Sequence, residues 1–489
     1  MRYVSTWRPS GARLTPRCGI FTLSVGILVA WGTCDILSAQ PKGAPPGPPG
    51  GHGGGAGSKK AAPPPKKAAP PPVATAPVPV DSQTGIPLGF EPKKEVPELM
   101  LLDQQLVSDD TLAKWAKDLS KYRTALRNGE LTPAAKALIT NGIKFRIATM
   151  TVKKNQQVLH EKREDLTVRD MRDAGIQLQK IDQLKTFCAW VNDEIIKETE
   201  PLLQNNFYVR VHAATLLGEL FLVPADEQKK WKFETYIPAV EPLRKVLRDA
   251  EQPTAVKIAA ARSMIRLIRY GDMPANKRFE TAKDVLAEVA KTDHHFWYQM
   301  RLVELLSTID APLDLETRKP TVVNELTGIL RDPKRHWHVR AEAARALGRV
   351  ALDPQVNISS LLQDLVQFAS EMSKAAQQQP KAPQWEMCFF KLYLAFQSID
   401  ASEKDATKKL RAGLLYNPAA SSAAKPAYDL ILPVVNAVIN EQAITAPQVQ
   451  AMDDWLSKSR PTASAKSSEV KPPSQGASNG PAASFAGEK

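Results

Sequence analysis

The chain has 489 residues and a net charge of +13, with 65 lysines and arginines against 52 aspartates and glutamates. Residues 1–80 hold four arginines and five lysines but one aspartate, so +8 of that charge lies there and only +5 remains for the other 409 residues. A nucleic-acid-binding face needs clustered lysine and arginine, which a body of mixed charge with a small excess does not supply. We therefore expect no nucleic-acid partner.

Residues 1–39 have the pattern of a secretory signal peptide. Several arginines precede an apolar run from Gly19 to Cys34, and Leu37-Ser38-Ala39 follows as a cleavage site. The sixteen residues of the run are short for a membrane span, which needs about 20. We expect export to the periplasm, the cell envelope or the medium, with cleavage after Ala39. An uncleaved N-terminal anchor is the alternative.

Residues 40–95 form an arm rich in proline, glycine, alanine and lysine, without an aromatic residue from Gln40 to Gly89. Such a segment cannot bury enough apolar area to offset its conformational entropy, so we expect it to be disordered. Its proline clusters favour an extended chain, and residues 41–80 are predicted to be a spacer close to a wall or membrane surface. Residues 461–489 are predicted to be a second disordered tail.

The body between these segments is poor in glycine, with only eight glycines from Val96 to Arg460. Because glycine costs about 1 kcal/mol relative to alanine inside a helix, this depletion predicts an all-helical body. Thr132-Pro133 is typical of a helix start, and Ile139, Ile143, Ile147 and Met150 then follow on one helix face.

Two cysteines, Cys188 and Cys388, would remain after signal cleavage. They lie 200 residues apart, without metal-ligand spacing and in apolar helical contexts. We expect both to be small buried apolar residues rather than a disulfide or a metal site.

Four segments between residues 201 and 350 follow one pattern. Their equivalent positions are 47, 42 and 41 residues apart and are occupied by Arg210, Lys257, Gln299 and Arg340. A period of this length is typical of repeats built from two helices. Each helical pair exposes an apolar face that it cannot bury alone, so neighbouring pairs must stack.

The stretch RDPKRHWHVRAEAARALGRV, from Arg331, resembles a HEAT repeat. The resemblance is carried by Val-Arg, Ala-Ala and Leu-Gly within residues 339–348 and again within residues 209–218. It implies an all-α fold, a right-handed α-solenoid of HEAT-like helical pairs over residues 201–350. Residues 96–200 would form its N-terminal helical part, and residues 351–460 its C-terminal capping part.

Stacking of the repeats predicts two further features. Arg-Asp is expected to close the first helix of a pair, and Gly218 and Gly348 to let neighbouring helices approach closely. In HEAT repeats an aspartate of the turn also pairs with an arginine of the next unit. Here Asp249 and Asp332 lie eight residues before Lys257 and Arg340, about two more than is usual, so the chain departs from that pattern.

Signatures of catalysis are missing from the sequence. It contains neither Gly-x-Ser-x-Gly nor His-Glu-x-x-His, and its glycine-rich stretch lacks the spacing of a nucleotide-binding loop. We expect a protein that is not an enzyme and needs no cofactor. His294-His295 and His336-x-His338 occupy equivalent turns, where they either cap helices or share a metal between units.

Aromatic residues lie in the same turns as these histidines, and arginines lie on the helices that follow the turns. Stacked in register, the rings either fill gaps between units or form a ridge that binds a partner. At equivalent positions, successive second helices carry Glu219, then Arg262, Arg266 and Arg269, then Glu304, and then Arg345 and Arg349. This order predicts a face on which acidic and basic units alternate. It serves either for ion pairs between units or as a groove for a protein. The candidate partner-binding residues are Phe207, Tyr208, Arg262, Arg266, His295, Trp297, Tyr298, Trp337, Arg345 and Arg349.

These observations predict an exported, non-catalytic scaffold that binds one or more proteins in the cell envelope. One alternative is an enzyme of HEAT-like build, such as a lyase or a glycosylase. Another is a protein that binds a wall polymer or anionic lipid through the basic arm.

Overall fold

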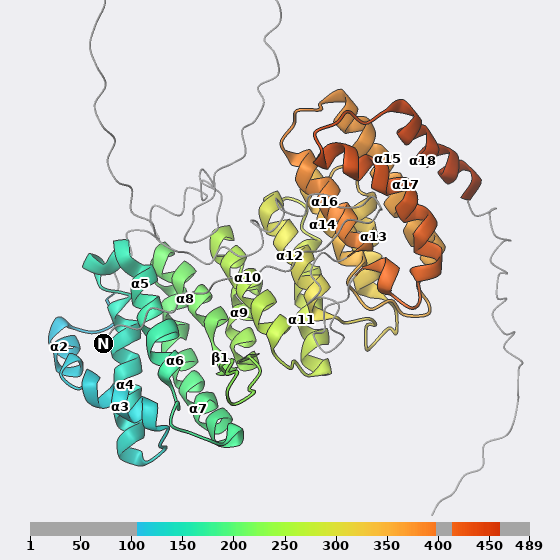
Figure 1. The fold of residues 1–489 in the computed structure, drawn as a ribbon. Coiled ribbons are helices and arrows are strands. Elements are labelled where there is room, and N and C mark those ends of the chain that lie inside the picture. The colour runs from blue at the N-terminus through green and yellow to red at the C-terminus, as the bar shows by residue number, and fades with distance from the viewer. Residues whose placement is uncertain (1–104, 398–412, 460–489) are drawn as a thin grey trace, which may run out of the picture. The chain divides into compact units, whose positions relative to one another are not determined.

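The computed structural model describes residues 105–397 and 413–459 (Figure 1). Most of these residues lie in helices, which confirms the all-α prediction. The predicted signal peptide, the arm and the C-terminal tail lie outside the described residues. Among the described helices, none is both long enough and apolar enough to cross a membrane.

Residues 105–204 form the first group of helices. Their bounds are α2 (Asp109–Ala116), α3 (Leu119–Asn128), α4 (Pro133–Thr149), η2 (Lys153–Val158), α5 (Leu159–Glu164), the π-helical turn η3 (Asp165–Asp170), α6 (Met171–Asp173), α7 (Ile181–Thr199) and η4 (Glu200–Gln204). Helix α4 packs against α3 and α7. Its stripe of Ile139, Ile143 and Ile147 is buried in the core, as its spacing predicts.

The start of α4 is the predicted one. The Oγ1 atom of Thr132 accepts a hydrogen bond from the amide of Ala135 at 3.3 Å, and Pro133 is the first helical residue. Replacing Thr132 by alanine leaves an amide of the first turn without its acceptor, so we expect the free energy of unfolding to fall by about 1 kcal/mol. Thr132→Ser, which retains the acceptor, should cost much less in the same urea titration; equal losses would contradict the assignment of the cap.

The central part contains the predicted repeats. Its elements are α8 (Phe207–Glu219), β1 (Phe221–Val223), β2 (Glu234–Thr235), η5 (Ile237–Ala239), α9 (Val240–Arg248), α10 (Thr254–Tyr270), α11 (Ala275–Val289), α12 (Phe296–Ile309), α13 (Thr321–Arg331) and α14 (Trp337–Leu347). Helix α9 packs against α10, α11 against α12, and α13 against α14. Helices α9 and α13 end at Arg248 and Arg331 with Asp249 and Asp332 as C-caps, so Arg-Asp closes the first helix in two pairs as predicted.

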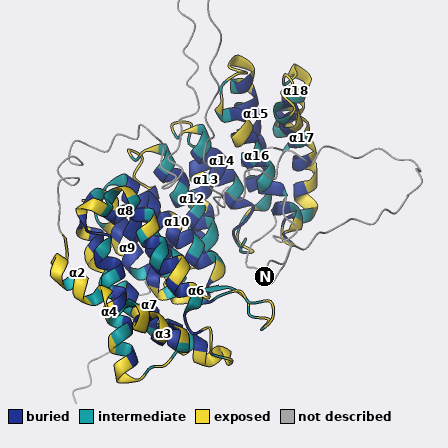
Figure 2. Ribbon diagram, turned by 60° about the vertical axis from the view of Figure 1, so that its left-hand side comes forward, coloured by how far each residue is buried: buried dark blue, intermediate teal, exposed yellow. Residues whose placement is uncertain are grey.

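The pairs are arranged in two rows (Figure 1). The first helices follow one another in contact, α9 with α11, α11 with α13 and α13 with α15. The second helices do the same from α8 through α10, α12 and α14 to α16. Helices α10 and α14 are buried over most of their length because each has a neighbour on both sides and a first helix behind it (Figure 2).

A short antiparallel hairpin lies between α8 and α9, although the sequence showed no convincing strand pattern. Strands β1 and β2 pair Phe221 with Thr235 and Val223 with Glu234, and β1 packs against α7. The hairpin and its loop lie in the longest interval between repeat positions, the 47 residues from Arg210 to Lys257. It was missed because strands of three and two residues are too short to show an alternating pattern.

The first repeat position is joined to the next unit through an amide side chain. The Arg210 side chain donates to the carbonyl of Asn205 at 2.5 Å and to the Gln252 side chain at 3.2 Å. Gln252 in turn donates to the carbonyl of Leu203 at 3.0 Å. Gln252, in the turn of the next unit, therefore makes the contact with Arg210 for which Asp249 is spaced too far away along the chain.

The other repeat positions are also buried and also reach the next unit. Their side chains meet a carboxylate or a guanidinium there, so the position joins neighbouring units whichever polar residue occupies it. The pairs are Lys257 with Glu288 (3.5 Å), Gln299 with Arg335 (2.7 Å) and Arg340 with Glu371 (2.6 Å).

The last described elements are α15 (Ile358–Gln378), α16 (Gln384–Phe396), η7 (Leu414–Tyr416), α17 (Ser421–Ile439) and α18 (Ala446–Ser459). Helix α17 packs against α15 and α16, and α18 packs against α15 and α17. Cys188 in α7 and Cys388 in α16 are both buried and both free thiols, as predicted.

Candidate functional site on the second helices

Two of the four turn histidines cap the helices that follow them. His295 is the N-cap of α12, where its Nδ1 atom accepts a hydrogen bond from the amide of Trp297 at 3.2 Å. His336 is the N-cap of α14 and accepts from the amide of His338 at the same distance. The equivalent positions in two units thus have the same local geometry.

Rings of the two turns also stack on one another. The ring of Phe296 lies 4.6 Å from that of His295 and 4.3 Å from that of His336, and it is inclined by only 19° to the latter. His336 and His338 are stacked at 5.3 Å. Within the described ranges, no three histidine, cysteine or carboxylate side chains are grouped so that they could hold a metal ion.

The predicted aromatic residues differ widely in exposure. Tyr298 is completely buried and donates a hydrogen bond to Glu288 at 3.3 Å, so it is not part of a surface ridge. Trp337 is half-buried, with its ring 5.5 Å from that of Trp385. Among these predicted aromatic residues, Tyr208 has an exposed side chain, with 40% of its surface accessible. The rings therefore fill gaps between helices more than they form a continuous ridge.

The remaining candidate residues lie as follows. Phe207 and Trp297 are half-buried beside their turns, whereas the ring of His295 reaches the surface. Arg262 is exposed, and Arg266 and Arg345 are half-buried. Arg349 is only 7% exposed, so the prediction that it contacts a partner on the surface is wrong.

A chain of ion pairs runs along the second helices from α12 to α16. Glu304 pairs with Arg301 of its own helix at 2.5 Å and with Arg345 of α14 at 3.6 Å. Glu342 pairs with Arg345 at 2.5 Å and with Lys391 of α16 at 2.9 Å. Ion pairs between units, one of the two predicted roles of the charged face, are thus present.

The sequence prediction missed Arg301, Glu342 and Lys391 in this chain of ion pairs. The first two were detectable, because each lies three residues from the opposite charge on its own helix. Lys391 carried no such signal, since its carboxylate partner is 49 residues away in sequence. Burial acts to raise the pKa of Glu342, but Arg345 and Lys391 outweigh it and lower the pKa to about 2.

A thiol and an imidazole meet next to the ion pairs. Sγ of Cys388 lies 3.4 Å from Nδ1 of His338, a separation at which a cysteine nucleophile and its base could interact. Burial raises the pKa of Cys388 to about 12. Burial, Lys391 and His336 lower the pKa of His338 to about 4. Both groups are therefore neutral at pH 7, and the pair has no thiolate to act as a nucleophile.

The lowered pKa of His338 predicts a loss of stability in mild acid. The unfolded chain takes up a proton near pH 6.5, while the folded chain does so only near pH 4. The free energy of unfolding must therefore fall as the pH falls from 6.5 to 4. His338→Leu, which fills the space without a titrating group, should flatten this dependence in denaturant titrations. Parallel profiles for the two proteins would contradict it.

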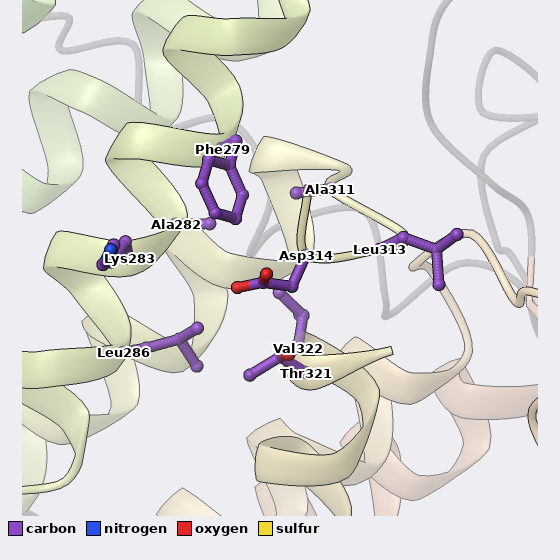
Figure 3. Close-up of a pocket in the computed structure, with 9 residues that line it drawn as sticks. All are labelled: Phe279, Ala282, Lys283, Leu286, Ala311, Leu313, Asp314, Thr321 and Val322. Atoms are coloured by element: carbon purple, nitrogen blue, oxygen red, sulfur yellow. The ribbon is translucent and has the colours of Figure 1, made fainter. Parts of the chain in front are cut away.

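Two pockets in the described part of the chain lie away from the second helices. One, of about 120 Å³, lies between α11 and the segment that leads into α13 (Figure 3). It is mostly apolar, and the Asp314 carboxylate at its edge already accepts hydrogen bonds from the amides of Glu316 and Thr317. The other, of about 340 Å³, is lined by α9 and the turns next to it, including Lys245 and Asp249.

The chain matches no family model, no curated protein and no solved structure.

Proposed function

We propose that this protein is an exported, non-catalytic scaffold, an α-solenoid of HEAT-like helical pairs that binds protein partners in the cell envelope. The proposal combines the signal-like residues 1–39 with the repeats of residues 201–350. Residues 41–80 would hold the scaffold at a distance from a wall or membrane surface.

The observation that carries the proposal is the unbroken row of second helices from α8 to α16. Stacked helical pairs create extended surfaces to which residues of several units contribute, and such surfaces suit protein partners. The buried side chains at the repeat positions, among them Arg210 and Arg340, support the same reading because they join each unit to the next.

An enzyme of HEAT-like build has less support. The geometry most suggestive of catalysis is the Cys388–His338 pair, whose two groups are neutral and buried. The polymer- and lipid-binding alternative depends on the basic arm, which lies outside the described residues.

The test is photocrosslinking in the native envelope. A photoreactive residue at exposed Tyr208, near the start of the second-helix row, should give specific adducts with a small set of envelope proteins. A matched probe at Leu315, which is also exposed (48%) but lies in the loop between α12 and α13, should give few. Adducts of equal number and identity at both positions, or none at Tyr208, would count against a binding surface on the second helices.

A further inference from the structure

The charged residues of helix α10 itself are all basic. Its seventeen residues contain one lysine, four residues into the helix, and three arginines further on, without an aspartate or glutamate. The lysine is Lys257, which is buried and pairs with Glu288 of α11. Arg262, Arg266 and Arg269 lie on the outer part of the helix. Burial and Arg301 lower the pKa of Arg262, and Glu304 of α12 acts in the opposite direction.

These three arginines share one side of α10, since they are spaced at i, i+4 and i+7. Arg262 is exposed, and the other two are half-buried. Arg266 donates to the carbonyl of Gly218 at 2.9 Å, which fixes its position without neutralising its charge. Arg269 has no hydrogen bond or ion pair within the described part of the chain, and its Nε atom is buried without an acceptor.

Two aromatic rings border the same side of the helix. The guanidinium of Arg266 lies 5.7 Å from the ring centre of Phe233, which belongs to the loop of the hairpin. Phe233 meets Tyr270, the last residue of α10, edge to face at 5.7 Å. Tyr270 is 48% exposed. Arginine and tyrosine together are enriched where proteins bind one another, because both combine a wide contact area with a polar group.

We propose that this arginine patch, Arg262, Arg266, Arg269, Phe233 and Tyr270, binds a short acidic segment of a protein partner. The inference rests on the proposed scaffold function and names the chemistry of the partner. Guanidinium groups bind carboxylates in bidentate pairs, and the exposed ring of Tyr270 offers an apolar contact beside them.

The neighbouring helices explain why a peptide fits better than a long polyanion. Helix α8 presents Glu219 and helix α12 presents Glu304 at the corresponding positions, each paired with an arginine. The positive charge is therefore one helix wide. A nucleic acid or an anionic polymer would need a longer, uniformly basic track, whereas a few carboxylates can be accommodated on one helix.

The experiment measures binding of a fluorescein-labelled peptide of alternating glutamate and tyrosine to the full-length chain by fluorescence anisotropy. We expect Arg262→Glu combined with Arg269→Glu to weaken binding about tenfold, since each charge-assisted hydrogen bond is worth more than a neutral one. The matched control is Arg127→Glu with Arg172→Glu, an equal change of charge at two exposed arginines of the N-terminal helices, and it should leave binding unchanged. Circular dichroism checks that the variants fold, and Arg269→Gln alone should give a smaller loss in the same direction.

Several results would overturn the inference. Equal losses of peptide binding in the patch variant and the control would place binding elsewhere, for instance on the basic arm. If the wild-type protein does not bind the peptide, an acidic partner for this patch is ruled out. If duplex DNA or dextran sulfate displaces the labelled peptide at a lower concentration of negative charges than the unlabelled peptide does, the site prefers a polyanion. Self-association of the chain that the patch variant abolishes would indicate a second copy. If envelope crosslinks from Tyr208 persist in the patch variant, the scaffold function stands and only this inference fails.

Discussion

Replacing Glu342 by glutamine is expected to lower the free energy of unfolding by about 3 kcal/mol, because it breaks a buried ion pair from one side only. Glu342 is 3% exposed and accepts from Arg345 and Lys391. Lys391 is itself only 8% exposed, so its ammonium group would remain buried without the carboxylate. Urea or guanidinium titration of the purified chain measures the loss.

A second substitution distinguishes this explanation from simple damage to the fold. Lys391 lies next to the sulfur of Met300, so the uncharged side chain of Lys391→Met has an apolar neighbour there. Combined with Glu342→Gln, it should recover much of the lost stability, because no charge is then left unpaired. A double variant less stable than the single one would contradict the argument.

Two further comparisons sharpen the result. Glu316→Gln makes the same chemical change in an ion pair with Lys283 whose side chains are both more than 60% exposed, and it should lower the free energy of unfolding by well under about 1 kcal/mol.

The pKa of Glu342 lies below its usual 4.5, so the wild type should lose stability as the pH falls from 4.5 towards 2. Glu342→Gln should lack that component.

Replacing Gly348 by alanine should destabilise the protein by about 2–3 kcal/mol, and larger residues by more, because there is no room for a side chain. A Cβ atom at this position would lie 2.1 Å from the carbonyl oxygen of Ala395 in α16. The obstacle is backbone, which cannot rotate away as a flexible side chain could. Helices α14 and α16 would have to separate, at a cost to their packing.

Gly328→Ala is the matched control. Gly328 lies inside α13, and a Cβ atom there would meet no heavy atom within 4 Å. The same substitution should therefore raise stability by up to about 1 kcal/mol through helix propensity alone. Thermal unfolding of the two variants checks the opposite signs. Destabilisation of similar size at both positions would show that close approach of α14 and α16 is not what requires glycine at residue 348.

Features that depend on neighbouring residues in the chain could be predicted before the structure was known. Thr132-Pro133 predicted a cap, Arg-Asp predicted two helix ends, and the spacing of Ile139 and its partners predicted a buried face. Each is set within one or two helical turns, where hydrogen-bond donors, backbone freedom and the 3.6-residue period act directly. For the same reason the all-α class followed from the scarcity of glycine, and the buried state of Cys188 and Cys388 from their apolar surroundings.

Features that join one unit to another were harder to predict. The repeat positions were recognised, but Gln252 could not be identified as the partner of Arg210 from spacing alone. Tyr298 and Trp337 occupy equivalent turns and looked equally suited to a surface ridge, yet they end in different surroundings. Tyr298 turns inward to Glu288, while Trp337 packs against Trp385 of α16.

By itself, then, the sequence determined which stretches are helical, where several of them begin and end, and which faces are apolar. Only the tertiary structure decided that Lys391 meets Glu342, that the rings of Phe296 and His336 stack, and that Arg266 and Arg269 remain without a carboxylate partner among the described residues. The physical reason is that helix formation and capping are local, whereas a partner in another unit depends on how the helices settle against one another, and that in turn depends on the packing of many side chains at once.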